Sequence, residues 1–245
     1  MCTLNKLYVV GIGPGAAEQM TVKALRVLES CEVIAGYGVY VDLVKPMLPE
    51  KEYLVTPMRK EAERCRMAID CALAGKTVAM ISSGDAGVYG MAGLIYELAA
   101  GKDLEIEVVP GVTAALSGGA VLGAPLTHDF AVISLSDRLT PWEKIEKRLT
   151  CAAEADLSMV LYNPASHGRP DHLRRACEIL LRVLPEDRPC AVAQHIGREG
   201  ENRRFFTLGE LKDAEVDMFC TVFIGNASTR MIGGNMVTPR GYRDV

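Results

Sequence analysis

A glycine-rich turn with the sequence GIGPG, residues 11–15, follows an apolar segment near the start of the chain. Turns of this kind after a strand often bind a dinucleotide phosphate, because bare backbone can approach the ligand closely. This turn lacks the G-x-G-x-x-G spacing, and Pro14 removes an N–H donor that a phosphate would use. No Gly-Lys-Ser/Thr sequence is present there either. We therefore predict that the turn is a rigid wall rather than a phosphate cradle.

Four further apolar segments end in turns of small and polar residues. The turns have the sequences ISSGDAGVYGMAG, VVPGVTAA, YNPASHGRP and IGNASTR. Asp85 lies in the first of them, where its carboxylate could pair with a ligand ammonium or hydroxyl or could bond the backbone of its own turn. Five such turns suit a ligand that is clasped by backbone and apolar walls, such as an S-adenosyl group with its adenine and cationic sulfur.

Composition limits the class of protein. The 245 residues are 49% hydrophobic, and 27 Lys and Arg against 31 Asp and Glu give a formal net charge of −4. Without a basic run, we expect no nucleic-acid or membrane partner. No apolar signal-peptide core precedes the first glycine turn, and no stretch reaches the roughly 20 apolar residues of a membrane span, so we expect a cytoplasmic protein. The eight scattered cysteines predict reduced, mostly buried thiols.

Hydrophobic periodicity predicts strands that alternate with helices in an α/β protein. The expected strands are LYVVGIG, EVIAGY, TVAMISSG, IEVVPG, FAVISLS, SMVLYNP, CAVAQHIG and MFCTVFIGN. The expected helices are TVKALRVLES, KEAERCRMAIDCALAG, PWEKIEKRLTCAAEA and DHLRRACEILLRVL, with Thr21 as a cap and Gly75 as a stop. The stretch 113–129 is rich in small residues and carries no charge until its end. It predicts a tightly packed helix and linker between two α/β domains, residues 1–115 and 116–245. A single domain of nine or ten strands is the alternative.

These motifs together resemble the tetrapyrrole methylase family. The resemblance covers essentially the whole chain and rests on GIGPG, SGDAGVYGMAG, VVPGVTAA, HDFAVISLSDRLTPWEKIEKRL, LYNPASHGRPDHL and FIGNASTRMIGGNMVTPRGY. GDAGVYGMAG, ISLSDRLTPW, YNPASHGR and IGNAST resemble the branch that methylates carbon 17 of a corrin precursor. The resemblance implies two α/β domains, each with a mixed, mostly parallel sheet flanked by helices, and a ligand cleft between them.

The resemblance also implies a cofactor, a substrate and an assembly. The cofactor would be S-adenosylmethionine, the substrate precorrin-3B or cobalt-precorrin-3, and the assembly a homodimer. The reaction would methylate carbon 17 with contraction of the ring. The implied cofactor residues are Pro14, Gly84, Asp85, Val88, Tyr89, Thr113, Ala114, Asn163, Gly225, Asn226 and Ala227. Many family members have proline after the Gly-Asp pair, and this chain has Ala86, which puts the detailed backbone contacts of that turn in doubt.

Ring contraction moves protons, so an acid or base near the macrocycle should assist. The candidates are His128, Ser136 and Asp137. His128 could shuttle a proton or could simply bond a backbone carbonyl, and Asp137 could be a catalyst or part of a turn or ion pair. Ser136 could face the ligand or only the polar side of a strand.

Corrin precursors carry many carboxylates, and arginine suits bidentate contact with them. The candidates for substrate binding are Tyr37, Arg59, Arg138 and Arg169. Each arginine could instead be a solvated surface charge, and Tyr37 could belong to the core. No residue spacing requires a metal site.

Three rival functions stay open. A sibling methylase could act on another ring carbon, such as that of precorrin-4. An RNA or diphthamide-pathway methyltransferase could share the fold, although the lack of a basic stripe opposes RNA. A nucleotide sensor without catalysis would be separated by its binding of NAD or ATP.

Overall fold

The computed structural model describes residues 5–243 and divides into two compact units after Ala114. The elements of the first unit are β1 (Lys6–Gly11), η1 (Ala17–Gln19), α1 (Val22–Ser30), β2 (Val33–Tyr37), α2 (Gly38–Val44), β3 (Glu52–Thr56), α3 (Glu61–Leu73), β4 (Val78–Ser82), α4 (Ala92–Ala99) and β5 (Glu105–Val109). Those of the second unit begin at the boundary with α5 (Ala114–Leu122), followed by β6 (Gly123–Ala124), β7 (Phe130–Ser134), α6 (Trp142–Glu154), β8 (Ser158–Tyr162), α7 (His172–Leu180), β9 (Pro189–Gln194), β10 (Asn202–Thr207), α8 (Leu208–Leu211), β11 (Cys220–Ile224), β12 (Arg230–Ile232) and β13 (Asn235–Val237).

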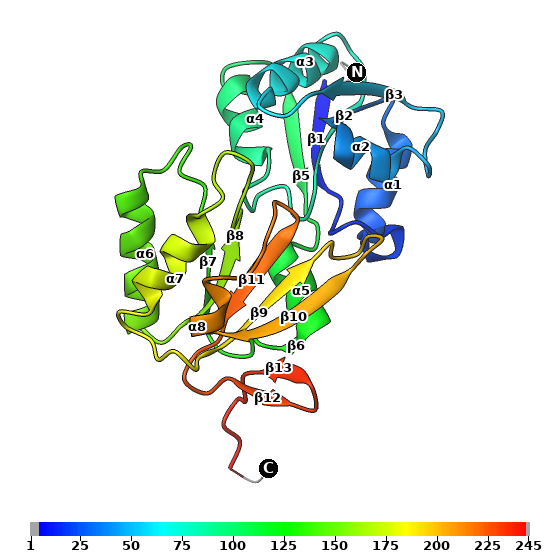
Figure 1. Cartoon of the computed structure of the whole chain (residues 1–245). Coiled ribbons are helices and arrows are strands. Elements are labelled where there is room, and N and C mark those ends of the chain that lie inside the picture. Colours follow the sequence, from blue (N-terminus) through cyan, green and yellow to red (C-terminus); the bar gives the residue numbers. More distant parts are fainter. Residues whose placement is uncertain (1–4, 244–245) are drawn as a thin grey trace. The chain divides into compact units, whose positions relative to one another are not determined.

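The first unit contains a parallel five-stranded sheet in the order β3-β2-β4-β1-β5 (Figure 1). Alternate residues of its strands enter two separate cores. Val9 packs with α3 and α4 on one face, and Val10 packs with α1 and α2 on the other. Because all five strands run in one direction, their carboxyl ends lie at a single edge, where the predicted ligand turns follow.

The helix ends of the first unit follow the sequence signals. Thr21 caps α1, and its Oγ1 accepts a hydrogen bond of 3.1 Å from the Ala24 amide. Gly75 follows α3 with a φ of 96°, a conformation that glycine adopts without a steric penalty. Both predictions are confirmed.

The second unit contains a five-stranded sheet in the order β10-β9-β11-β8-β7. Only β7 and β8 pair in parallel, whereas β8–β11, β11–β9 and β9–β10 are antiparallel. The expectation of a mostly parallel sheet was therefore wrong for this unit, although the α/β fold class is confirmed. The physical reason is that a short hairpin joins β9 to β10, and β11 enters between β8 and β9 in the opposite direction. A small third sheet has the order β12-β13-β6.

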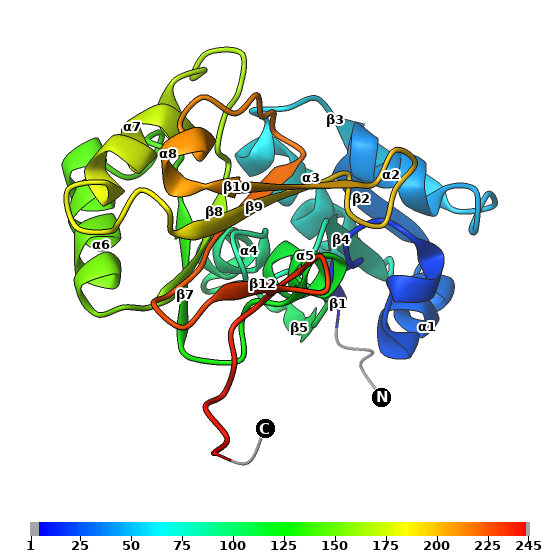
Figure 2. The ribbon, with the colours of Figure 1, turned by 60° about the horizontal axis from the view of Figure 1, so that its bottom comes forward.

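Helices cover both faces of the second unit's large sheet. Apolar residues of α6, α7 and α8 form one core with β7, β8, β9 and β11, and Figure 2 shows α6 and α7 side by side. On the other face, Gly118 of α5 lies against Phe223 and Ile196. A helix is thus present in the small-residue stretch as predicted, and Gly118 allows its close approach to the sheet.

The eight expected strands and four expected helices are all present. The elements that the sequence did not predict are mostly short or at a sheet edge: η1, β3, β6, β10, β12, β13, α2, α4 and α8. Within residues 5–243, no helix is both long enough and apolar enough to cross a membrane.

Two adjacent glycines of α5 give a matched test of this packing. A Cβ at Gly118 would lie 2.9 Å from Phe223 Cζ and from Ile196 Cδ1, whereas the nearest atom to a Cβ at Gly119 is Leu126 Cδ1 at 3.5 Å. We expect Gly118→Ala to lower the free energy of unfolding by about 1–3 kcal/mol through overpacking. Gly119→Ala should raise it by up to about 1 kcal/mol, because alanine favours the helix. Urea unfolding measures both, and equal effects of the two substitutions would contradict this packing.

Candidate functional site

Three glycine turns of the first unit pack backbone against backbone. They follow β1, β4 and β5, which are adjacent in the sheet. Gly13 and Gly84 exchange two hydrogen bonds, with N···O distances of 3.0 and 2.7 Å. A Cβ at Gly111 would lie 2.2 Å from the Gly84 oxygen and 2.6 Å from the Gly11 oxygen, so a side chain at that position would force the backbone apart. Pro14 is buried directly after this contact, as expected of a wall.

Asp85 binds these turns together. Its Oδ1 accepts hydrogen bonds from the amides of Gly87 at 2.8 Å and Val88 at 3.1 Å. Its Oδ2 accepts one of 2.9 Å from the Gly111 amide in the neighbouring turn. Of the two roles that the sequence left open, the carboxylate thus performs the structural one, and it also joins the second turn to the third. Each hydrogen bond to a charged group contributes about 1.5–3 kcal/mol to the free energy of unfolding.

The turn held by Asp85 exposes two side chains that were expected at the cofactor. Val88 is 36% exposed, and Tyr89 is 55% exposed with a φ of 54°. Thr113 is also adjacent, because a Cβ at Gly84 would lie 3.5 Å from the Thr113 Cα. The structure therefore brings Gly84, Asp85 and Thr113 together and presents apolar and aromatic surface beside them.

Two expected substrate residues follow neighbouring strands at the same edge. Tyr37 is the last residue of β2, and its ring lies edge-on to that of Tyr40 at 5.3 Å. Arg59 follows β3 in an exposed loop with a φ of 70°, and its amide donates to Glu61 Oε1 at 3.3 Å. Parallel strand direction places both at the carboxyl edge, where the glycine turns also lie.

A polar network occupies one edge of the large sheet in the second unit. Ser134 ends β7, and its Oγ accepts hydrogen bonds from Asn163 Nδ2 at 3.0 Å and from the Ser136 amide at 3.2 Å. Asn163 directly follows β8 and has a φ of 55°. The Tyr162 hydroxyl accepts a hydrogen bond of 2.7 Å from the Ala115 amide. Asn163, the cofactor residue expected in this unit, is thus oriented by its neighbours.

Ser136, Asp137, Arg169 and His172 form a cluster at this edge. Arg169 Nη1 donates to Ser136 Oγ at 2.7 Å and lies 3.8 Å from Asp137 Oδ1. His172 Nε2 lies 3.1 Å from Asp137 Oδ2. Desolvation raises the pKa of the Asp137 carboxyl, but the contact with His172 and the charge of Arg169 outweigh it, so the pKa is lowered overall. Three expected site residues therefore meet here.

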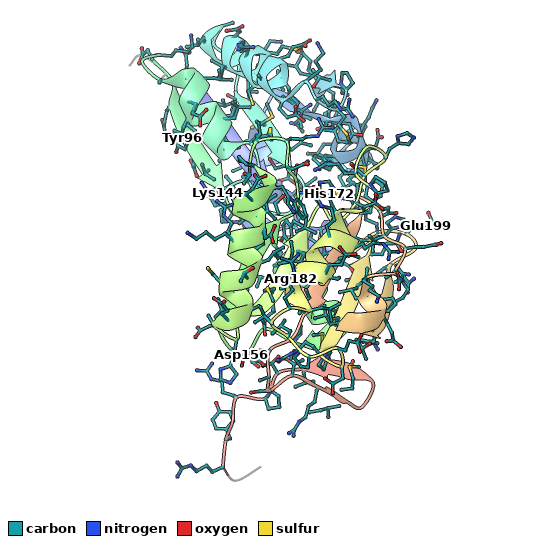
Figure 3. All side chains as sticks on the ribbon, turned by 60° about the vertical axis from the view of Figure 1, so that its left-hand side comes forward. Tyr96, Lys144, Asp156, His172, Arg182 and Glu199 are labelled. Carbon is teal, nitrogen blue, oxygen red and sulfur yellow. The ribbon has the colours of Figure 1, made fainter. Side chains whose placement is uncertain are left out.

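His172 is a member of this cluster that sequence reasoning did not select. It is the first residue of α7, as labelled in Figure 3, and is 6% exposed. The rings of His172 and Trp142 meet edge-on, with their centroids 5.0 Å apart. The Arg175 guanidinium lies over the Trp142 ring, 3.9 Å from its centroid. Sequence spacing gives no signal for the contact of His172 with Asp137, because the two residues lie far apart in the chain.

Other expected residues lie elsewhere. His128 precedes β7, at the end of that strand opposite to Asp137, and its Nε2 lies 3.1 Å from the Pro239 oxygen. This matches the alternative in which His128 bonds a backbone carbonyl. The turn 225–227 follows β11 and is therefore at the opposite edge of the antiparallel sheet from Asn163, with the Ala227 amide donating to Asp156 at 2.8 Å. Arg138 is exposed in the loop after Asp137.

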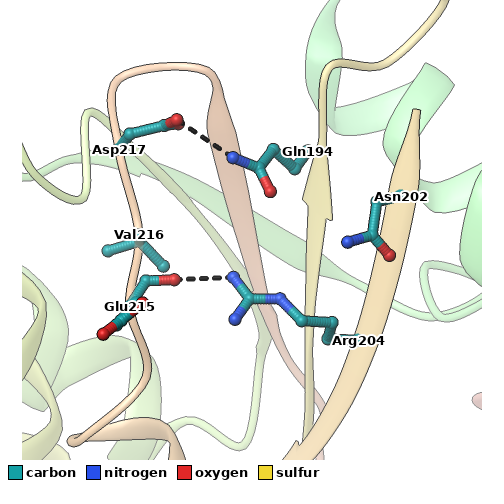
Figure 4. Close-up of a pocket in the computed structure, with 6 residues that line it drawn as sticks. All are labelled: Gln194, Asn202, Arg204, Glu215, Val216 and Asp217. Atoms are coloured by element: carbon teal, nitrogen blue, oxygen red, sulfur yellow. Dashed lines mark hydrogen bonds between the residues drawn. The ribbon is translucent and has the colours of Figure 1, made fainter. Parts of the chain in front are cut away.

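Two cavities adjoin the edge that carries Asn163. A cavity of about 640 Å³ lies between residues 165–170 and the irregular segment 214–219, and its walls include Ala165, Pro170 and Val216. A polar cavity of about 420 Å³ lies on β9 and β10 (Figure 4). There Gln194 Nε2 donates to Asp217 at 2.9 Å and Arg204 Nη2 to the Glu215 oxygen at 2.6 Å, so the segment that borders both cavities is tied to the sheet.

Most of the cysteines that the structure describes are buried and protonated. Seven described cysteines have free thiols, and five of them are buried. Burial raises the pKa of Cys65 to about 11 and that of Cys177 to about 12, which keeps both protonated. In the part of the chain that the structure describes, no group of three or more His, Cys, Asp or Glu side chains could hold a metal ion.

Comparison with known proteins identifies similar sequences over nearly the whole chain. A family model described as Tetrapyrrole (Corrin/Porphyrin) Methylases matches residues 6–212. The chain is 47% identical to a "Probable cobalt-factor III C(17)-methyltransferase" of Salmonella typhimurium, over 96% of this chain and 99% of that relative. It is 40% identical to a "Precorrin-3B C(17)-methyltransferase" of Sinorhizobium sp, over 96% of each.

Solved structures share the fold. The crystal structure of the methyltransferase CobJ aligns with a TM-score of 0.89 and 36% identity, over 95% of this chain and 99% of that one. Uroporphyrin-III C-methyl transferase from Thermus thermophilus, complexed with S-adenyl homocysteine, aligns with a TM-score of 0.73 and 24% identity, over 90% of this chain and 97% of that one. The overall fold of the chain is thus one that solved methyltransferase structures also have.

Asp85→Asn tests the link between the turns. An amide nitrogen in place of one carboxylate oxygen cannot accept from a backbone N–H, so at least one of the three hydrogen bonds is lost. We expect the free energy of unfolding to fall by about 1–3 kcal/mol and amide hydrogen exchange at Gly111 or at Gly87 and Val88 to accelerate. Asp42→Asn, at an exposed position of α2, is the control. Unchanged exchange at all three amides in Asp85→Asn would refute the role of this carboxylate.

Asp137→Asn tests the ion pairs of the second unit through pH. The folded-state pKa of Asp137 lies below its unfolded value, so the carboxylate stabilises the fold above about pH 4–5 and loses this contribution as the pH falls through the lower pKa. The stability difference between wild type and variant should stay below about 1 kcal/mol, because the side chain is partly exposed. This stability difference should become smaller at acidic pH. Asp187→Asn is the exposed control, and a pH-independent difference for Asp137→Asn would exclude the ion pair as its cause.

Proposed function

The chain belongs to the tetrapyrrole (corrin/porphyrin) methylase family, and from this premise we propose that it methylates carbon 17 of a corrin precursor in cobalamin biosynthesis. The observation that carries the proposal is the 47% identity, over 96% of the chain, to a relative named as a cobalt-factor III C(17)-methyltransferase. The lower identity of 40% to the precorrin-3B relative leads us to propose a cobalt-containing substrate. We also propose that methylation accompanies ring contraction.

We propose S-adenosylmethionine as the methyl donor. When bound, it supplies a methyl group on a cationic sulfur, and the protein contributes mainly position and exclusion of water. The first unit fits the methionine end: Asp85 fixes the backbone of its turn, and Val88 and Tyr89 are exposed on it. Thr113 and Ala114 follow the adjoining turn and stay half-buried. These residues would hold the donor chiefly by backbone groups and apolar contact.

We place the adenine differently from the sequence-based expectation. Gly225, Asn226 and Ala227 follow β11 at the edge of the sheet away from Asn163. They are therefore too far from Asn163 in the sheet for us to place the adenine beside both. The cavity of about 640 Å³ beside residues 165–170 has the size and partly apolar lining of a small-molecule site. We therefore propose that its walls, including Ala165 and Val216, receive the adenine ring.

We assign proton transfer to the Asp137–His172 pair rather than to His128. The low pKa of Asp137 keeps it ionised and makes it a poor proton acceptor by itself at neutral pH. A carboxylate 3.1 Å from an imidazole nitrogen can instead fix the orientation of that imidazole. Arg169, oriented by Ser136 and by Ser166 at 3.2 Å, would bind a substrate carboxylate beside the pair.

Further features of the proposal follow from the family. We propose that the two units are the domains expected at residues 1–115 and 116–245. Tyr37, Arg59 and Arg138 would contact the macrocycle or its acidic side chains. We propose a cytoplasmic homodimer with no nucleic-acid partner.

An anaerobic incubation with S-adenosylmethionine tests the proposal. Cobalt-factor III and metal-free precorrin-3B are supplied in parallel, and the products are read by mass. We expect one methyl group to be added to the cobalt-containing substrate and none in a control in which S-adenosylhomocysteine replaces the donor. Methylation of precorrin-3B alone would correct the metal assignment. No methylation of either substrate by a protein that still binds S-adenosylhomocysteine would refute the carbon-17 assignment and favour a sibling methylase.

A further inference from the structure

Arg64 is a buried cation for which the described chain offers no anion. It lies in the first turn of α3 and is 4% exposed. Its Nη1 donates to the Thr56 hydroxyl at 2.6 Å, and its buried Nε has no hydrogen-bond partner among residues 5–243. No carboxylate of the described residues forms an ion pair with it. A hydroxyl is therefore the one side-chain acceptor that the structure shows for this guanidinium.

The other buried arginine of the described residues shows what Arg64 lacks. Arg188 is 8% exposed, and its Nη1 lies 3.5 Å from Asp156 Oδ1. A guanidinium cannot be deprotonated in a protein, so it cannot escape the cost of burial by becoming neutral. Buried arginines are accordingly almost always paired with an anion. The Nε of Arg188 also has no hydrogen-bond partner among residues 5–243, so the two arginines differ in the ion pair, which Arg188 forms within the chain and Arg64 does not.

The acidic residues nearest to Arg64 in sequence are already engaged. Glu61 accepts a hydrogen bond from the Arg59 amide at 3.3 Å. Glu63 pairs with Lys60 at 2.7 Å and is exposed. The missing anion must therefore come from outside this segment.

The position of Arg64 points to a ligand. Thr56 is the last residue of β3 and lies opposite Tyr37, the last residue of β2. Both are at the carboxyl edge of the parallel sheet, which is where open α/β sheets bind ligands. The hydrogen bond to Thr56 holds the guanidinium in one orientation. A planar anion that binds to Arg64 therefore has less side-chain entropy to remove.

We propose that Arg64 and Thr56 form a binding site for a carboxylate group of the ligand. The site rests on the proposed function, which offers two sources of a carboxylate: an acidic side chain of the tetrapyrrole and the amino-acid end of S-adenosylmethionine. The chemistry is the same for both, since a guanidinium fork matches the two oxygens of a carboxylate.

Arg64→Met separates a ligand-binding role from a structural one. The variant removes a buried, unpaired charge and keeps most of the apolar volume, so the ligand-free protein should be as stable as wild type or more stable. The affinity for the ligand that supplies the carboxylate should fall about 10- to 100-fold. Arg66→Met, an exposed arginine on the same helix, is the matched control and should change neither quantity. Thr56→Val, which removes the acceptor of Nη1, should weaken the same affinity less than Arg64→Met.

Two measurements on each variant distinguish the sources. Calorimetry gives the affinity for S-adenosylhomocysteine, and the KM for the tetrapyrrole is measured at saturating donor. A loss confined to the first assigns the site to the cofactor carboxylate, and a loss confined to the second assigns it to the substrate. Turnover by the wild-type protein tests the proposed function separately, and the S-adenosylhomocysteine measurement does not depend on it.

Several outcomes would overturn the site. Arg64→Met could leave both affinities unchanged, or it could shift the protein from dimer to monomer with both affinities intact, which would assign the anion to a second copy. If Arg64→Met destabilises the ligand-free protein, Arg64→Lys provides the second test. The lysine variant keeps the charge but not the fork, and wild-type affinities in it would show that the guanidinium contributes packing only.

Discussion

The structure of the first unit depends on one constraint: the backbones of three turns must touch at the carboxyl edge of the sheet. Gly111 approaches both Gly84 and Gly11 so closely that a Cβ at Gly111 would overlap with the Gly84 oxygen. Asp85 then satisfies two amides of its own turn and one of the next. Main-chain atoms and one carboxylate, that of Asp85, therefore hold the three turns together. The opening glycine turn is thus a structural support for the two neighbouring turns.

The second unit builds its candidate site by a different means. Its large sheet is mostly antiparallel, so strand ends of both directions meet at the edge that carries Asn163 and Asp137. Side chains rather than touching backbones hold this edge, through Ser134, Arg169 and His172.

Local signals in the sequence predicted the elements and turns well, because apolar periodicity and glycine positions are properties of short segments. Thr21, Gly75 and the helix at Gly118 followed from such signals. The direction of β11 did not, since strand order in a mixed sheet depends on contacts between distant segments. Residue spacing also could not show that Asp137 contacts His172, or that Arg64 is buried with no carboxylate partner among the described residues. Both depend on which face of a helix is packed against the rest of the protein.

The most direct test of the central claim is a crystal structure of the protein with S-adenosylhomocysteine. We predict that the homocysteine end contacts Thr113 and the turn of residues 84–89. The hydrogen bonds between Gly13 and Gly84 and between Asp85 and Gly111 should stay as they are in the ligand-free protein. Density for the ligand beside Gly225–Ala227 instead, or a ligand that separates the three glycine turns, would contradict it.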